Sequence, residues 1–178
     1  TLRGKCLGIV GFGGIGRRMA ELGNALGMDV IAWTPHASRY DAPTYCRFRT
    51  FEEVLAHADA LSLHIAESEQ THHLIDAAAL ARMKRSCLLI NTARGAIIDE
   101  EALIAALDKG ALGGAALDVF SEEPLPATSP LLGRDDVLTT PHIGYHTPEA
   151  NRAIQNLALD AIEGFMAGQP KLVVAAPS

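Results

Sequence analysis

Long hydrophobic runs are missing from this 178-residue sequence, and so are clusters of basic residues. Its apolar runs, such as residues 87–90, have the length of a β-strand, whereas a membrane-spanning helix needs about 20 apolar residues. The formal net charge is −6, which gives no electrostatic footprint for nucleic acid. We therefore expect neither membrane insertion nor nucleic-acid binding, and residues 1–5 show no signal-peptide pattern.

Cysteine is also scarce, with three residues at unpatterned spacing: Cys6, Cys46 and Cys87. The sequence has no Cys-x-x-Cys pair, so we expect neither a metal site nor a disulfide framework. Cys6 and Cys87 lie in strand-like runs, where we expect them to act as small buried hydrophobic residues. A reducing, cytoplasmic location is the expectation that follows.

The sequence does contain short aliphatic runs that alternate with helical patterns, which is typical of a parallel sheet with crossover helices. Strands are predicted at residues 6–10, 29–33, 60–65, 87–91, 113–117 and 137–140. Helices are predicted at residues 15–26, 51–57, 77–83, 100–107 and 148–167. The first helix is expected to bury an apolar stripe formed by Ile15, Met19, Leu22 and Leu26. The length predicts one domain spanning residues 1–178.

A glycine-rich loop, Gly11-Phe12-Gly13-Gly14-Ile15-Gly16, stands directly after the first predicted strand and directly before the first helix. In this context the G-x-G-x-x-G pattern predicts a dinucleotide site: Gly11 makes the tight turn, Gly13 admits the pyrophosphate, and Gly16 permits close helix packing. The pyrophosphate is expected to lie on the amides of Gly14, Ile15 and the rest of the first helical turn. We therefore predict a Rossmann-type α/β fold, a doubly wound parallel sheet with helices on both faces.

The residue expected to contact the adenosine ribose leaves the choice between NAD and NADP open. An Asp or Glu usually ends the second strand of such folds, but here Thr34 follows the strand. A neutral Thr does not repel a 2′-phosphate, and Arg39 or His36 offers a cation to pair with one. The alternative is that Thr34 hydrogen-bonds the ribose and Arg39 is a solvated loop residue, so NAD and NADP stand about even.

Three charged or titratable residues follow three later strands: Arg94, Glu123 and His142. Loops at the carboxyl ends of parallel strands line the ligand crevice, so these side chains are expected to converge there. An Arg grips a carboxylate bidentately, and a Glu beside an imidazole favours its protonated form, which suits a general acid. This set of groups suits reduction of a 2-oxo acid. The other six histidines have no such neighbours in the sequence and are expected to be structural or surface residues.

The segments around these residues resemble the D-isomer-specific 2-hydroxyacid dehydrogenases. The similar segments are Asn91-Thr92-Ala93-Arg94-Gly95, residues 114–120, Glu123-Pro124 and Thr140-Pro141-His142-Ile143-Gly144. The resemblance implies that Arg94 binds the substrate carboxylate and carbonyl while His142 exchanges the proton. It also implies that Glu123 supports the protonated His142, that Asp118 contacts the nicotinamide carboxamide, and that the domain forms homodimers.

Members of that family have about twice this length, because a substrate domain of roughly 100 residues precedes the segment that the sequence resembles. We therefore expect the substrate domain to be missing from this chain, as an excised domain or as a natural truncation. Two functions remain open. One is the cofactor half of an enzyme that interconverts small 2-oxo acids and D-2-hydroxy acids. The other is a dinucleotide-binding module, such as a redox sensor or a corepressor-like subunit, without useful turnover.

Overall fold

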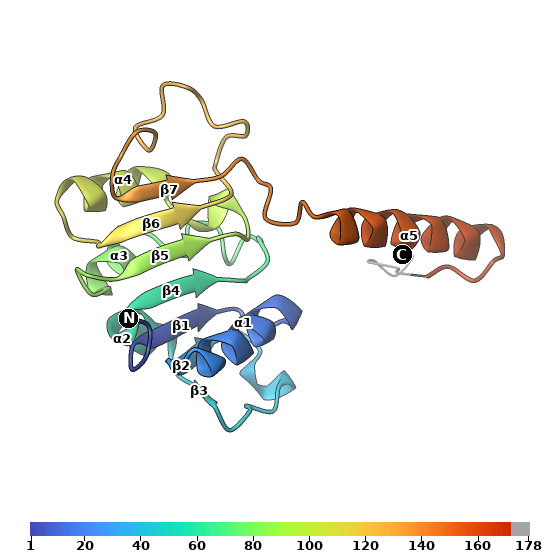
Figure 1. Cartoon of the computed structure of the whole chain (residues 1–178), viewed down its shortest axis with the longest axis horizontal. Coiled ribbons are helices and arrows are strands. Elements are labelled where there is room, and N and C mark those ends of the chain that lie inside the picture. Colours follow the sequence, from blue (N-terminus) through green and yellow to red (C-terminus); the bar gives the residue numbers. More distant parts are fainter. Residues whose placement is uncertain (172–178) are drawn as a thin grey trace. The chain divides into compact units, whose positions relative to one another are not determined.

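A computed structural model describes residues 1–171, which divide between two compact units that begin at Thr1 and at Ile143. The first unit, Thr1–His142, contains a seven-stranded parallel sheet with the strand order β3-β2-β1-β4-β5-β6-β7 (Figure 1). The strands are β1 (Cys6–Val10), β2 (Asp29–Trp33), β3 (Cys46–Phe48), β4 (Ala60–Leu63), β5 (Leu88–Asn91), β6 (Gly114–Leu117) and β7 (Val137–Thr139). The order reverses between β1 and β4, which is the switch point where such sheets bind ligands.

Helices cover both faces of this sheet, which confirms the predicted Rossmann-type α/β fold. They are α1 (Gly14–Ala25), α2 (Phe51–His57), α3 (Ala77–Arg82) and α4 (Glu100–Asp108). One face packs on α2, α3 and α4, whose buried side chains include Leu55, Leu80 and Leu103. The other face packs on α1 through a smaller cluster that contains Ala20 and Phe12. The sheet core therefore has two separate apolar layers.

The prediction for the buried face of α1 is wrong. Ile15 is 74% exposed, and Leu22 and Leu26 are also exposed, so the apolar stripe lies largely in solvent. The helix instead buries Gly16, Ala20 and Gly23. A β-carbon at Gly23 would come within 2.5 Å of Leu7 on β1, so only small residues let this helix approach the sheet so closely. Close approach, and not side-chain hydrophobicity, selects the buried face.

The predicted strands match the structure to within two residues at each end, but β3 was not predicted. This strand has three residues, one of them the exposed Arg47, and extends the edge of the sheet beside β2. So short a segment has no alternation that a sequence pattern can reveal. Helix boundaries agree equally well, and Thr50 and Glu53 form the predicted capping box of α2.

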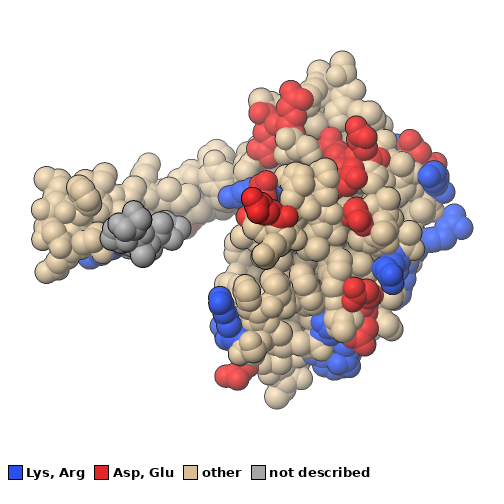
Figure 2. Space-filling view, turned by 180° about the vertical axis from the view of Figure 1, so that it is seen from behind, with Lys and Arg blue, Asp and Glu red and all other residues tan. Residues whose placement is uncertain are grey.

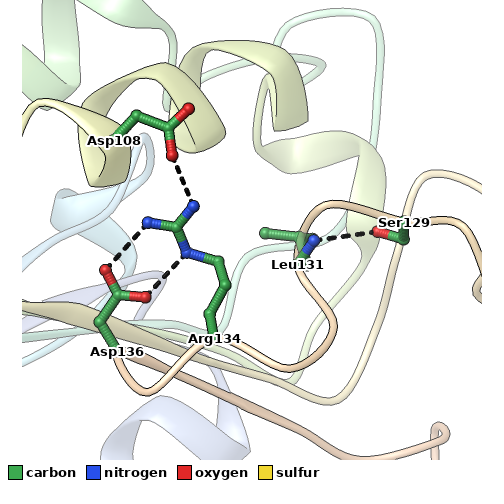
Figure 3. Close-up of polar contacts among 5 residues, drawn as sticks. All are labelled: Asp108, Ser129, Leu131, Arg134 and Asp136. Carbon is green, nitrogen blue, oxygen red and sulfur yellow. Dashed lines mark hydrogen bonds and ion pairs between the residues drawn. The ribbon is translucent and has the colours of Figure 1, made fainter.

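The long loop between β6 and β7 is fixed to the body of the first unit at two points. Leu131 is fully buried, and its backbone N–H donates to the Ser129 hydroxyl (Figure 3). Arg134 forms a two-pronged pair with Asp136 and a 2.6 Å bond to Asp108 at the end of α4 (Figure 3). The loop that carries Glu123 is thus held by an apolar anchor and a charged anchor.

The second unit contains one long helix, α5 (Pro148–Met166), in its described part. Thr147 caps this helix by accepting a hydrogen bond from the Ala150 N–H. The apolar residues Ile154, Leu157 and Phe165 on it are exposed. Gly164 is its buried residue, where the chain from Gln169 returns against the helix.

The cysteines are free thiols, as the sequence predicted. Cys87 is fully buried, and burial raises the pKa of its thiol to about 12; Cys6 is half-buried. Residues 1–171 contain no helix that is both long enough and apolar enough to cross a membrane. On the face shown in Figure 2, acidic and basic side chains of the first unit are interspersed.

Candidate active site

The glycine-rich loop after β1 has the shape that a dinucleotide requires. Gly11 has a φ of +95°, and a β-carbon there would lie 2.6 Å from the backbone of His64. A β-carbon at Gly16 would lie 2.0 Å from the carbonyl oxygen of Gly11. Gly13 and Gly14 differ from these two, because nothing lies within 4 Å of the β-carbon position of either residue. The loop is therefore packed tightly on its inner side and open on its outer side, so a phosphate can approach the backbone.

The start of α1 is also open to an anion. Gly13 is the N-cap residue of α1 and provides no side-chain hydrogen bond. In residues 1–171 the other α-helices each have a side-chain cap, contributed by Thr50, Asp76, Asp99 or Thr147. The first-turn amides of α1 thus keep their donors and the positive end of the helix dipole for an incoming group. This arrangement fits the pyrophosphate of a dinucleotide.

A cleft of about 840 Å³ lies at the carboxyl ends of β1, β4 and β5. It is bounded by the exposed side chain of Ile15 on one side and by Arg94 on another. Its remaining lining residues belong to the segments after β4 and β5: His64, Ile65, Ala66, Glu67, Ser68, Glu69, His72, Thr92 and Ala93. The glycine loop and the predicted substrate-binding Arg therefore share one cleft, at the switch point of the sheet.

Asn91, the last residue of β5, shapes the loop that presents Arg94. Its fully buried side chain accepts a 3.0 Å bond from the Ala93 N–H and donates a 2.9 Å bond to the Arg94 carbonyl. Arg94 is exposed, and its guanidinium donates to the Ala93 carbonyl oxygen. Asn91 belongs to one of the motifs described above, but no role was predicted for it. An Asn at the end of a strand, whose side chain bonds the backbone two residues later, is the signal for such a turn.

Gly95 brings the Arg94 loop against the loop that follows β6. A β-carbon at position 95 would lie 2.0 Å from the carbonyl group of Phe120 and 2.6 Å from the Ser121 nitrogen. The two backbones touch because residue 95 has no side chain. Hydrogen bonding to His142 is the main cause of the lowered pKa of Glu123, and the positive charge of Arg94 adds a smaller effect in the same direction.

Glu123 and His142 form a direct pair. The His142 Nδ1 lies 2.7 Å from Oε2 of Glu123, while Oε1 accepts a 3.0 Å bond from the Phe120 N–H. These two contacts, with His142 first, hold the pKa of the Glu123 carboxyl below its usual value. His142 has a φ of +53°, a left-handed conformation that costs a residue with a β-carbon about 1–3 kcal/mol and is concentrated at functional sites. The structure thus brings all three predicted catalytic residues to one edge of the sheet.

Asp118 lies just beyond the end of β6 and is buried. Its Oδ1 accepts a 2.5 Å hydrogen bond from the hydroxyl of Thr140, which follows β7. The pair therefore links the ends of neighbouring strands beside the Glu123–His142 pair. A second cleft of about 600 Å³ begins here, with mostly apolar lining: Phe120, Glu123, Pro124, Leu125, Leu132, Thr139, Thr140, Pro141 and His142.

Of the residues predicted to contact the adenosine ribose or its phosphate, only Thr34 lines a cleft at the end of β2. Thr34 is nearly buried at the end of β2 and lines a third cleft, at the ends of β2 and β3. Arg39 lies exposed in a 3-10 turn (Ala37–Arg39), and neither it nor His36 lines that cleft. Arg49 lines it instead. Arg49 was not among the predicted site residues, because β3, which positions it, was not predicted.

Two histidines that the sequence did not distinguish also line the first cleft, His64 and His72. The His64 Nε2 lies 2.9 Å from the hydroxyl of Ser62, and burial lowers the pKa of its imidazole. His72 stacks on His73 with ring centroids 4.0 Å apart. His64 and His72 reach the cleft because of the path of the loop that follows β4, and a sequence pattern does not predict that path.

The combination of an uncapped glycine loop, a cleft at the switch point and a Glu–His pair beside an Arg defines the class of the protein, a Rossmann-type dinucleotide-binding domain. Residues 1–144 match the family described as D-isomer specific 2-hydroxyacid dehydrogenase, NAD binding domain. This chain belongs to that family.

Similar proteins support the same assignment. The chain is 49% identical over 162 residues to an (S)-sulfolactate dehydrogenase of Chromohalobacter salexigens, covering 90% of this chain and 52% of the relative. A solved D-lactate dehydrogenase of Aquifex aeolicus, complexed with NAD and lactic acid, matches with a TM-score of 0.85 and 32% identity, covering 98% and 58%. An acyclic imino acid reductase complexed with NADPH and D-Arg matches with a TM-score of 0.88 and 30% identity, covering 98% and 55%. The chain thus spans about half the length of these relatives.

Proposed function

We propose that this chain is the cofactor-binding half of an NAD(P)-dependent dehydrogenase that interconverts small 2-oxo acids and D-2-hydroxy acids. The observation that carries the proposal is the 2.7 Å contact between His142 and Glu123 beside the Arg94 loop. With Nδ1 held by a carboxylate, the imidazole has a fixed orientation, and its Nε2 side serves for proton exchange with the substrate oxygen. Glu123 stabilises the protonated ring.

Arg94 has the role of substrate binder in this proposal. Its guanidinium, exposed at the cleft, offers a planar pair of donors that match a carboxylate. The backbone contact between Gly95 and Phe120 keeps this group near the Glu123–His142 pair. A 2-oxo acid bound by Arg94 would therefore present its carbonyl oxygen to His142, which supplies the orientation that carbonyl reduction requires.

The dinucleotide would extend along the glycine loop from the first cleft to the third. Gly11, Gly13, Gly14, Ile15 and Gly16 would hold its pyrophosphate, and Thr34 would contact the adenosine ribose. Asp118, oriented by Thr140, would accept a hydrogen bond from the nicotinamide carboxamide. When bound, the cofactor supplies or accepts the hydride.

We propose further that residues 1–178 together are the dinucleotide-binding domain, and that a second domain completes the dehydrogenase by covering the cleft. The coverage of similar proteins supports this view, since the relatives described above match across most of this chain but over only 52–58% of their own length. Covering the cleft would exclude water and fix the substrate, which affects the rate by orders of magnitude. The second candidate function is a dinucleotide-binding module without useful turnover, which needs only the open glycine loop at the start of α1.

One experiment separates these two functions. The chain is titrated with NADH and NADPH by fluorescence and then assayed with glyoxylate, hydroxypyruvate, pyruvate and sulfopyruvate. Oxidation of the cofactor that is lost in His142→Ala, and kept in the matched surface variant His57→Ala, supports the dehydrogenase. Binding without oxidation, both by the chain alone and by a dehydrogenase in which it is joined to a substrate domain, supports the module. Binding of neither cofactor contradicts both.

We also propose that the protein is a cytoplasmic homodimer. Two observations support a second copy as the partner. Helix α1 contacts β1 and β2, at the other end of the sheet from β7. On the β5–β7 part of the sheet, Leu88 and Leu138 are 50% and 66% exposed. The loop of residues 120–132 offers less apolar surface to a partner, because Phe120 and Leu131 within it are buried. Sedimentation of the wild type and of Leu138→Glu tests this proposal. A monomeric wild type at micromolar concentration would contradict it.

A further inference from the structure

The third cleft has a composition unusual for an adenosine site. It measures about 690 Å³ and lies at the carboxyl ends of β2 and β3. Its lining residues are Trp33, Thr34, Ala37, Phe48, Arg49, Thr50, Phe51, Glu52 and Glu53. No carboxylate stands at the end of β2, where such folds place the group that bonds the ribose 2′-hydroxyl and repels a 2′-phosphate. The cleft contains one guanidinium, that of Arg49.

The sheet register places Arg49 beside the ribose position. Ala32 of β2 pairs with Phe48 of β3, and the Arg49 N–H donates a 2.9 Å hydrogen bond to the Ala32 carbonyl. Arg49 therefore lies level with Trp33, one residue before Thr34. This backbone position is fixed by the sheet, whereas Arg39 lies in an exposed 3-10 turn outside the cleft lining.

The Arg49 side chain has donors to offer. It is exposed, and its Nη1 donates a 3.2 Å hydrogen bond to the carbonyl of its neighbour Phe48. A guanidinium carries five N–H donors in a planar fork, which matches the oxygens of a phosphate monoester. Most of that fork remains available toward the cleft.

The acidic residues of the cleft oppose an anion to different degrees. Glu53 is engaged in the capping box: its Oε2 accepts a 2.9 Å bond from the Thr50 N–H, and this bond is the main cause of its lowered pKa. The Glu53 N–H is likewise taken by the Thr50 hydroxyl. Glu52 is exposed and takes part in no such box. Glu52 is therefore the acidic group that a phosphate in this cleft would encounter.

We propose that Arg49 is the residue that determines cofactor specificity, by pairing with the 2′-phosphate of NADP(H), and that Glu52 limits this preference. The inference rests on the proposed function, since it assumes that the chain binds a nicotinamide dinucleotide at the glycine loop. It shifts the choice of cofactor from the loop after β2 to the junction of β3 and α2. Thr34 permits the phosphate, and Arg49 attracts it.

The test is a titration of the full chain with NADH and with NADPH, for the wild type and for Arg49→Gln, Arg39→Gln and Glu52→Gln. Arg49→Gln should weaken NADPH binding about tenfold, the effect of losing a charge-assisted phosphate contact at an exposed site. NADH binding should change by less than about twofold. Arg39→Gln is the matched control and should leave both affinities unchanged. Glu52→Gln should tighten NADPH binding and leave NADH binding unchanged.

Three results would overturn the inference. Equal weakening of NADH and NADPH by Arg49→Gln would mean that Arg49 stacks on the adenine that both cofactors share. A selective loss of NADPH binding in Arg39→Gln would return the phosphate to the β2 loop. Unchanged affinities for both NADPH and NADH in Arg49→Gln would mean that Arg49 has no part in cofactor specificity. In each case NADH still binds, whereas failure of every variant and the wild type to bind either cofactor would overturn the proposed function itself.

Discussion

The Glu123 carboxylate joins His142 to the backbone of its own loop. One oxygen lies 2.7 Å from the His142 Nδ1, and the other accepts the Phe120 N–H at 3.0 Å. Because Phe120 in turn packs against Gly95, the orientation of the imidazole depends on the loop that carries Arg94. The loops that follow β5 and β6 thus both help to hold the Glu123–His142 pair.

Replacing Glu123 by Gln tests the charge of this pair. The single Gln carbonyl oxygen can accept from the His142 Nδ1 or from the Phe120 N–H but not from both, so the ring loses the anion that stabilises its protonated form together with one of the two bonds. In a dehydrogenase that contains this chain, we expect kcat/KM for 2-oxo acid reduction to fall about a hundredfold. Glu122→Gln, a change at the exposed neighbouring residue, should leave the rate unchanged. Equal rates for Glu123→Gln and wild type would show that the negative charge of Glu123 does not contribute to the reaction.

Two glycine substitutions separate folding from cofactor binding. Gly13→Ala adds a β-carbon in open space at a φ of −74°, so the thermal midpoint should stay near that of the wild type. NADH binding should nevertheless weaken at least about tenfold, because the methyl group occupies the approach to the backbone. Gly16→Ala should lower the midpoint as well, since its β-carbon would lie 2.0 Å from the Gly11 carbonyl oxygen. Thermal melts and fluorescence titrations check both. Unchanged NADH affinity in Gly13→Ala would contradict the assignment of the loop.

Leu131 should matter to stability far more than its neighbour. Leu131→Ala removes a fully buried side chain and should cost about 2–5 kcal/mol in urea unfolding. Leu132→Ala, at a side chain that is 41% exposed, is the control and should cost less than about 1 kcal/mol. Similar costs for the two would mean that the β6–β7 loop is not anchored at Leu131.

Asp59 should make stability depend on pH in the acid range. It accepts a 2.8 Å bond from the Cys6 N–H and a 2.9 Å bond from the Lys84 ammonium, and these contacts lower the pKa of its carboxyl. A lowered folded-state pKa gives stability that is present above the usual Asp value of about 3.9 and is lost as the pH falls through the lowered value. We expect Asp59→Asn to be about 1 kcal/mol less stable than wild type at pH 7, with the difference shrinking at about pH 3. Urea titrations at the two pH values measure it, and a difference that grows on acidification would contradict this account.

The sequence predicted most of the fold because each element carries a local signal. Thr50 with Glu53, Asp76 and Asp99 mark helix starts, and all four residues act in these caps in the structure. The face of α1 was not predictable in the same way. Its buried side is chosen by how closely Gly16 and Gly23 let the helix approach β1, a three-dimensional constraint with no hydrophobic period.

The candidate site was predictable to a similar degree. Placing Arg94, Glu123 and His142 at strand ends was enough to predict that they meet, because parallel strands end at one edge. The contacts that orient them were not predictable: Asn91 bonds the Arg94 loop, and Gly95 packs on Phe120 across two separate loops. Arg49 was missed for a related reason, since its place depends on a three-residue edge strand.

The absence of a side chain at position 95 has a consequence for any effort to retarget this scaffold. Residue 95 and Phe120 meet backbone to backbone, so a methyl group inserted there would wedge the two loops apart. Neither loop can then be rebuilt for a bulkier ligand while the other is kept as it is. A library that diversifies both loops together, with Gly95 held constant, is the one that this contact permits.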